Sequence, residues 1–125
     1  MTELRMHDAA PAAAQAADWR TATHKVVDDR GRTLAWRFLE YLEEVDLMLM
    51  VGDKAQNREW FSHAMVACML REVDGSPVAF PATEAGLRAN MQRVGRDGYK
   101  AILEDSARVA EADGGPEREQ AAAKN

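Results

Sequence analysis

Histidine and cysteine, the side chains that most often act as nucleophiles, bases or metal ligands, are few and scattered in this chain of 125 residues. The histidines stand far apart, at His7, His24 and His63. The single cysteine, Cys68, follows His63 by five residues, so on a helix their side chains would point about 140° apart. We therefore predict no nucleophile–base pair and no metal site. We expect Cys68 to be a buried core residue and His63 to lie on a helix face.

Adjacent carboxylates at Asp28 and Asp29 are the other candidate for acid–base chemistry. They lie in a polar cluster that ends at Gly31, and loop aspartates commonly hydrogen-bond their own backbone. Turn chemistry therefore accounts for the pair, with catalysis as the minor alternative. Residues 95–98 (GRDG) lack the spacing and the lysine of a phosphate-binding loop. We predict a protein that is not an enzyme and has no cofactor.

Four basic residues cluster around a short glycine-containing turn near the C-terminus: Arg88, Arg93, Arg96 and Lys100. Two helices joined by such a turn are typical of a helix-turn-helix, so one hypothesis is a small DNA-binding regulator that uses residues 84–110. Acidic side chains on the second helix, including Glu104 and Asp105, would repel phosphate. A solvated charged face is the other interpretation. The net charge of −5 also argues against a general nucleic-acid binder.

Methionine is unusually frequent, with seven residues in the chain. Met48 and Met50 fall in one predicted helix, and Met65 and Met69 in the next. Methionine is flexible and polarizable, and it suits both irregular cores and adaptable binding surfaces. Two interpretations stay open: filler between two packed helices, or an apolar groove that takes up a partner helix. Both hold if the groove stays closed until a client arrives.

The elements that position these residues begin with a β-hairpin. Leu34, Trp36 and Phe38 recur with period two, which is typical of a strand with one buried face. Gly31 supplies the positive φ that a short hairpin loop needs. The pattern therefore predicts a hairpin within residues 21–39.

A helix is predicted next, over residues 39–52. Leu39, Leu42, Val45 and Leu49 fall at helical spacing, and acidic residues fill the other side: Glu40, Glu43, Glu44 and Asp46. More apolar residues widen the surface beyond one stripe: Leu47, Met48, Met50 and Val51. We expect the C-terminal end of this helix either to be deeply buried or to dock on another molecule.

A second helix is predicted to begin after Asn57, which is a suitable N-cap. Its broad apolar face comprises Trp60, Phe61, Ala64, Met65, Cys68 and Met69.

A second hairpin is predicted over residues 71–80. Asp74-Gly75 favours a type I′ turn, and Pro77 confines its strand to an edge or a bulge. Pro81 ends that strand. Thr83 then caps a helix that Gly95 ends, and a last helix follows over residues 97–111.

These patterns predict a single small α+β domain, mostly helical, with about four helices and two short β-hairpins. We assign the domain to residues 20–110, between a mobile Ala-rich tail (1–19) and a mobile C-terminal tail (111–125). Gly114, Gly115 and Pro116 should break any helix in the latter. So small a core is marginal, and a partner or self-association would stabilise it. We expect a soluble intracellular protein, since neither a secretory signal nor an apolar run of about 18 residues is present.

The order of these elements resembles the small tail assembly chaperones of long-tailed bacteriophages and related prophages. The similarity covers about residues 23–103. It is greatest in the "VDGSPV" turn that begins at Val73, the helix after it and the "RVGRDG" stretch that ends at Gly98. The acidic, Met-rich helix of residues 39–52 departs from the family, where we would expect a more basic segment.

The resemblance implies a non-enzymatic chaperone of the host bacterial cytoplasm. Such proteins coat the apolar helices of a tape measure protein and recruit tail tube subunits. On this hypothesis the partner-binding residues are Met48, Met50, Trp60, Met65, Met69 and Phe80. We expect neither nucleic acid nor membrane as a partner, and self-association stays open. The closing Ala-Lys-Asn is also compatible with a −1 ribosomal frameshift that yields a longer product, as occurs in some of these genes.

Overall fold

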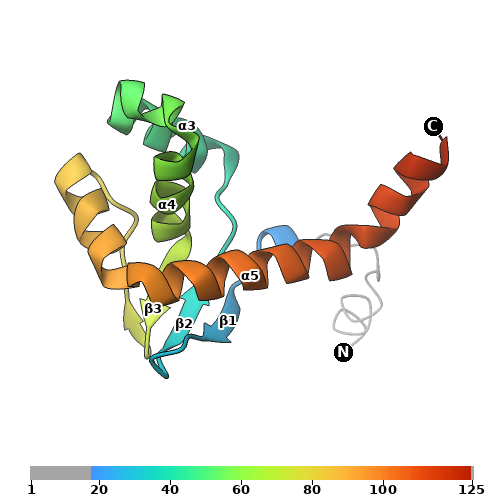
Figure 1. Cartoon of the computed structure of the whole chain (residues 1–125), viewed down its shortest axis with the longest axis horizontal. Helices are drawn as coiled ribbons and strands as arrows, with labels where there is room; N and C mark the ends of the chain where they lie inside the picture. The colour runs from blue at the N-terminus through green and yellow to red at the C-terminus, as the bar shows by residue number, and fades with distance from the viewer. Residues whose placement is uncertain (1–17, 125) are drawn as a thin grey trace, which may run out of the picture.

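A four-stranded antiparallel sheet, in the order β1-β2-β3-β4, forms one side of the molecule (Figure 1). Its strands are β1 (His24–Val27), β2 (Thr33–Trp36), β3 (Leu70–Val73) and β4 (Ser76–Pro77). The computed structural model describes the backbone of residues 18–124 and the side chains of residues 19–112. Both predicted hairpins are confirmed, and β2 joins them into one sheet by pairing with β3.

The pairing of β2 with β3 is the contact that the sequence pattern did not predict. Leu34 lies opposite Val73 and Ala35 opposite Glu72, and the register shifts between Ala35 and Trp36. This long-range pairing gives both short hairpins a common sheet. A two-stranded hairpin alone is at best marginally stable, so the shared sheet stabilises each of them.

The turn at Asp74-Gly75 reverses the chain as predicted. Both residues have positive φ, 50° and 85°, as a type I′ turn requires. The Asp74 carboxylate also accepts a hydrogen bond of 2.8 Å from the Thr33 backbone N–H, which ties the turn to β2. Pro77 pairs opposite Glu72 on the edge strand β4, where a residue without an N–H is tolerated.

Two helices connect the hairpins: α3 (Tyr41–Val51) and α4 (Arg58–Met69), with a 3₁₀ turn η2 (Gly52–Gln56) between them. The predicted N-cap of α4 is confirmed, because the Asn57 side chain accepts a hydrogen bond of 3.0 Å from the Trp60 backbone N–H. In Figure 1, α3 lies at the end of the molecule away from the hairpin tips.

The third helix, α5 (Glu84–Lys124), contains the two predicted C-terminal helices as parts of one element. Its predicted cap is confirmed, since the Thr83 hydroxyl accepts from the Gly86 backbone N–H at 3.0 Å. Gly95 interrupts the helix with φ 64° and ψ −176°, a conformation that only glycine adopts readily. We call residues 84–94 and 96–124 the first and second parts of α5.

The prediction that Gly114, Gly115 and Pro116 end the helix is wrong, because the α5 backbone continues to Lys124. Residues 117–124 are all Ala, Gln, Glu, Arg or Lys, which are strong helix formers, and they favour continuation. Most of the predicted N-terminal tail lies outside the described residues. A short 3₁₀ turn, η1 (Asp18–Arg20), precedes β1.

The core lies where α4, the sheet and α5 meet. Its largest fully buried side chains are Trp36, Leu34, Leu47, Leu70, Leu87, Ile102 and Cys68. Leu34 and Trp36 are buried as predicted, but Ala35 between them is buried as well, so β2 is covered on both faces rather than on one. Phe38 lies beyond the end of β2 and packs edge-on against Trp36. The Trp36 indole N–H donates to the buried Asp105 carboxylate at 2.9 Å and so ties the sheet to α5.

Arg32 links the first hairpin to the kink in α5. Its guanidinium donates to the backbone carbonyls of Arg93 (2.7 Å) and Val94 (2.8 Å), at the end of the first part of α5. Asp28 holds the same guanidinium at 2.8 Å. A break in a helix leaves carbonyls without intrahelical partners, and here an arginine from another element satisfies them.

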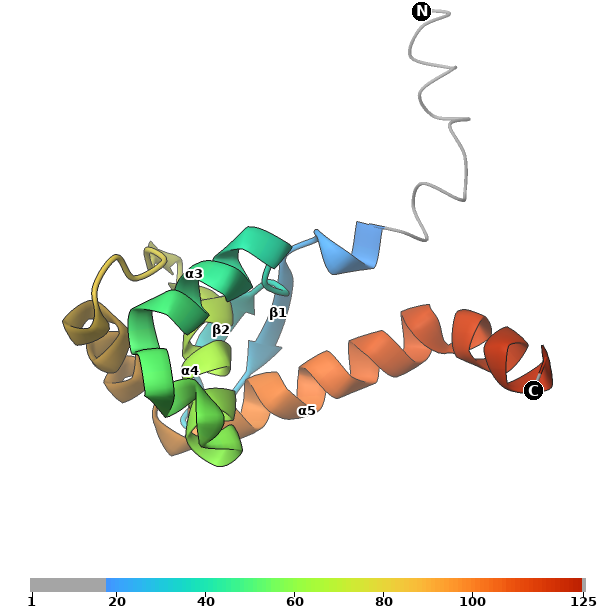
Figure 2. The same cartoon turned by 90° about the horizontal axis from the view of Figure 1, so that it is seen from above.

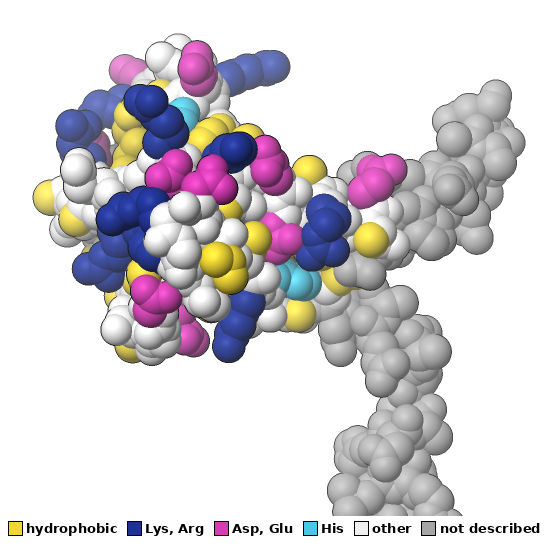
Figure 3. Space-filling model, turned by 60° about the horizontal axis from the view of Figure 1, so that its bottom comes forward, with side chains coloured by type: hydrophobic (Ala, Val, Ile, Leu, Met, Phe, Trp, Pro, Cys, Tyr) yellow, Lys and Arg dark blue, Asp and Glu magenta, His cyan; other side chains and the backbone are white. Residues whose placement is uncertain are grey.

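Seen from above, the second part of α5 begins against α4 and the sheet, and its C-terminal end extends away from them (Figure 2). No helix in the part of the chain that the structure describes is long and apolar enough to cross a membrane. On the face turned toward the hairpin tips, positive and negative side chains are interspersed, with hydrophobic ones between them (Figure 3). Charge is therefore not segregated by sign on that face.

Candidate functional site

Helix α3 exposes large apolar side chains on the side opposite the core. Tyr41 is 78% exposed, Leu42 68%, Met48 48% and Leu49 78%, and Val45 between them is half-buried. At about 100° per residue these positions share one side of the helix. Leu47 and Val51, on the other side, are buried. We call the set Tyr41, Leu42, Val45, Met48 and Leu49 the α3 apolar face.

The predicted stripe of Leu42, Val45 and Leu49 is therefore not the core side of α3, and the acidic residues do not fill the outward side. Glu43 instead faces inward and accepts two hydrogen bonds, of 3.0 and 3.1 Å, from the Arg71 guanidinium on β3. A helix with apolar residues on both sides can pack against the core with either side. In α3 the buried side is the one that carries Glu43, which forms the ion pair with Arg71.

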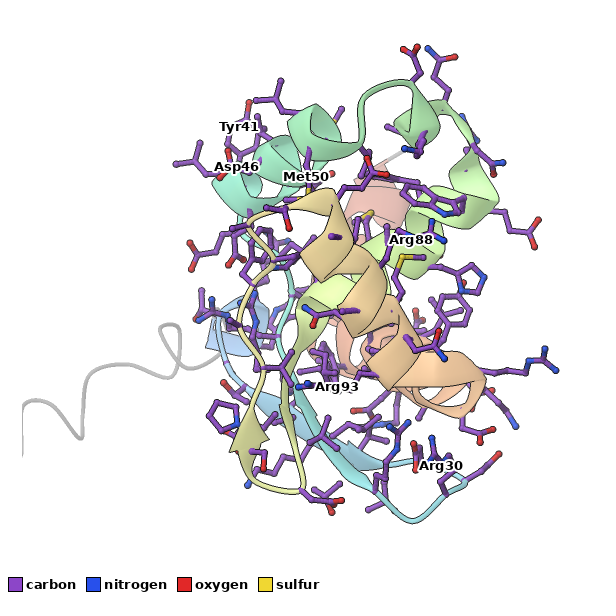
Figure 4. All side chains as sticks on the ribbon, turned by 90° about the vertical axis from the view of Figure 1, so that its left-hand side faces the viewer. Arg30, Tyr41, Asp46, Met50, Arg88 and Arg93 are labelled. Carbon is purple, nitrogen blue, oxygen red and sulfur yellow. The ribbon has the colours of Figure 1, made fainter. Side chains whose placement is uncertain are left out.

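Acidic side chains border the α3 apolar face. Glu44 is half-buried and Asp46 is exposed, and we call these two the acidic rim. Neither has an ion pair with a residue that the structure describes. In Figure 4, Tyr41 and Asp46 lie on the outer side of α3, whereas Met50 lies on the side toward the first part of α5.

The six residues predicted to bind a partner do not form one surface. Met48 belongs to the α3 apolar face, while Met50 and Phe80 are half-buried against the core. Met69 is only 7% exposed and contributes to the core. For this methionine the structure agrees with the interpretation as core filler and not as a groove. Met65 and Trp60 are half-buried on α4 and line two different hollows.

Sequence reasoning missed Tyr41, Leu42 and Leu49 as surface residues. The signal that could have found them is the excess of apolar residues in residues 39–52. Such a short helix cannot bury apolar side chains all round at the edge of a small domain, so one side must face outward.

Met65 and Met69 line a shallow apolar hollow of about 270 Å³ between α4 and α5. Phe61 and Leu103 are also among its lining residues, and Leu103 is 42% exposed. The hollow is small for a helix but has room for one large apolar side chain of a partner.

A larger hollow, of about 520 Å³, lies between α4 and α5 at the Gly95 kink. His63 stacks on Tyr99 at 3.8 Å between ring centres, which places it on the face of α4 as predicted. Arg88 and Arg96 also line this hollow, and neither guanidinium has a hydrogen-bond or ion-pair partner among the described residues. Figure 4 shows Arg88 and Arg93 on the first part of α5.

The remaining candidates for chemistry have structural roles. Burial raises the pKa of the Cys68 thiol to about 12, so it is a poor nucleophile. Asp28 accepts hydrogen bonds from the backbone N–H groups of Arg30 and Arg32, as predicted for a loop aspartate. His24 stacks on Trp36 at 4.6 Å. His7 lies outside the described residues, and within them no group of His, Cys, Asp and Glu is arranged to hold a metal ion.

Comparison with known proteins gave no match to a family model, a curated protein or a solved structure. The surfaces of this chain are therefore what indicates its function. Of these surfaces, the α3 apolar face combines the greatest exposure with the largest apolar side chains.

Proposed function

We propose that this protein is a non-enzymatic tail assembly chaperone of a long-tailed phage or prophage, which binds apolar helices of a tape measure protein and helps to recruit tail tube subunits. The observation that supports this proposal is the α3 apolar face, where Tyr41 and Leu49 are each 78% exposed. Contiguous exposed apolar side chains commonly mark a protein-binding surface. The order of the hairpins and helices, which resembles that of these chaperones, supplies the identity of the client.

The geometry of the face suits a helical client. Tyr41, Val45 and Met48 lie at positions i, i+4 and i+7, and Leu42 and Leu49 form a second row seven residues apart. Two helices pack by placing such rows into the grooves of the partner. Met48 adapts its shape to different client side chains. The face therefore fits a long apolar helix that offers several similar sites.

The double variant Leu42→Asp/Leu49→Asp tests this proposal. Co-expression of the unmodified chain with the neighbouring tape measure protein should give a complex that co-purifies. The variant should lose the complex while keeping its circular dichroism spectrum, because the two leucines are 68% and 78% exposed. Val27→Asp, at a site 62% exposed on β1, is the matched control and should bind normally. A folded variant that still binds the client would contradict the proposal.

A second candidate is a small helix-turn-helix-like DNA-binding regulator that uses residues 84–110. It is favoured by Arg88 and Arg96, which line the hollow at the kink and have no partner in the described part of the chain. Against it, Lys100 lies 3.6 Å from Asp29, and the charges in Figure 3 are mixed in sign. If the protein binds DNA in this way, its affinity for duplex DNA should fall steeply as salt is added. The affinity should also be lower in the double variant Arg88→Gln/Arg96→Gln. Fluorescence anisotropy that detects no binding at low salt would exclude it.

A further inference from the structure

We infer that the helix that docks on the α3 apolar face is cationic and amphipathic, with Lys or Arg along both edges of its apolar stripe. The inference rests on the proposed function, since it names the chemistry of the partner at the same face. It also assigns the face to a client rather than to a second copy of this chain.

The first argument is the position of the acidic rim. At about 100° per residue, Glu44 lies about 40° from Met48 around the helix, and Asp46 lies about 40° from Leu42 on the opposite edge. The apolar face therefore has a carboxylate on each side. Helix α3 contains no Lys or Arg at all. A docked helix meets negative charge along both of its edges.

Second, among the residues that the structure describes, none compensates the charge of the rim. The nearby Glu43 faces inward, where Arg71 and Arg37 lie 3.0 and 3.7 Å from its carboxylate. Lys54, three residues beyond the end of α3, is held at 2.6 Å by Glu84. These three cations are thus engaged by other carboxylates, and the rim is available to charges of a partner.

The third argument is the fit of lysine and arginine to such a rim. Their aliphatic stems cover the edges of an apolar stripe while their charged ends reach carboxylates beside it. The same arrangement sets partner choice in paired helices, where charges flank an apolar seam. A neutral apolar helix would cover the face but leave the rim carboxylates without partners, so it should bind less well.

A second copy of this chain is disfavoured as the occupant. In a two-fold interface the same patch faces itself, so two α3 apolar faces would bring two acidic rims together. Glu44 and Asp46 of both copies would then repel one another, and α3 has no Lys or Arg to separate them.

Three peptides of about 18 residues test the inference, a length at which Ala-rich sequences begin to form helices. They share one apolar stripe and differ only in their flanking residues, which are Lys, Gln or Glu. Fluorescence anisotropy with the full chain should show binding of the Lys peptide at least about tenfold tighter than the Gln peptide, and the Glu peptide should bind weakest. The differences should shrink as salt is added.

Charge reversal on the protein supplies the matched control. Glu44→Lys/Asp46→Lys should reverse the order of the three peptides. Glu59→Lys/Glu104→Lys changes the net charge by the same amount at exposed helix positions away from α3 and should leave the order unchanged. Reversal in both variants would mean that net charge, not the rim, selects the partner, and would overturn the inference.

The outcomes also separate this inference from the proposed function. Equal affinity for all three peptides, abolished by Leu42→Asp/Leu49→Asp, would overturn the inference and leave the proposed function intact. Absence of binding to every peptide, together with a tape measure complex that survives the leucine variant, would overturn both. A dimer in analytical ultracentrifugation that the leucine variant dissociates would assign the face to a second copy and overturn the inference.

Discussion

Asp28 has a structural role that its surroundings explain. Its carboxylate is fully buried in the first hairpin and bonds the Arg32 guanidinium that caps the first part of α5. Burial by itself would raise the pKa of Asp28, but hydrogen bonds from the backbone and side chain of Arg32, and the charge of Arg32, outweigh it. The pKa therefore lies below its ordinary value, and the ionised form stabilises the fold.

Asp28→Asn tests this at the residue scale. The folded pKa lies below the unfolded value, so the unfolded state binds more protons as the pH falls. The stabilisation is fully present only when the pH is well above the unfolded pKa of about 4, and it is lost as the pH falls through the folded pKa. We expect the variant to lose about 1–3 kcal/mol of unfolding free energy at neutral pH and less in acid.

Urea unfolding at neutral and acidic pH measures this difference. Asp29→Asn is the control, because the Asp29 side chain is 72% exposed and its change should be small. The same loss of stability at both pH values would show that Asp28 does not stabilise the fold through its charge.

At the scale of the element, α3 is a helix with two apolar sides and two different roles for them. A helix of 11 residues has little stability in isolation, so its inner side chains must hold it to the domain. Leu47 is fully buried, whereas Leu49, two residues later, is 78% exposed. The inner side therefore stabilises the fold, and the outer side is available to a partner.

A pair of alanine substitutions separates these roles. Leu47→Ala should lower the unfolding free energy by about 2–5 kcal/mol, because it leaves a cavity in the core. Leu49→Ala should change it by less than about 0.5 kcal/mol, as is usual for exposed sites. Urea denaturation of both variants, followed by circular dichroism, measures the difference. Similar losses in the two variants would contradict the orientation of α3.

At the scale of the whole molecule, polar contacts from the first hairpin reach both parts of α5. Arg32 reaches the end of its first part, and the Trp36 indole reaches Asp105 in its second part. Asp105 also accepts a hydrogen bond of 2.8 Å from Arg108. These contacts join segments that are more than 60 residues apart in sequence, with separations of 61, 62 and 69 residues. We therefore expect sheet and helices to unfold together.

Asp105→Leu tests this coupling. The change leaves the buried Trp36 N–H without an acceptor, which should cost about 1–3 kcal/mol. Tryptophan fluorescence and far-ultraviolet circular dichroism should report one coincident transition, shifted to lower urea in the variant. Two separate transitions in the unmodified chain would show that α5 and the sheet unfold independently.

The elements of this protein were predictable from its sequence where they depend on neighbouring residues. Asp74-Gly75 specifies its turn, Asn57 and Thr83 cap their helices, and Gly95 interrupts α5, because each acts through the local backbone. Local preference also explains why the predicted end of α5 was wrong. The helix propensity of the residues around Gly114-Gly115-Pro116 prevails, and the helix continues to Lys124.

The candidate site, in contrast, was only partly predictable. Of the α3 apolar face, Met48 was identified, whereas Tyr41, Leu42 and Leu49 were missed. Local spacing shows that α3 has two apolar sides but does not say which one is buried. That depends on Leu47 fitting the core and on Glu43 meeting Arg71, which is 28 residues away in sequence. The sequence by itself thus determined the elements, because turns and caps are local. The tertiary structure alone decided which surface is left for a partner, because burial depends on contacts between distant segments.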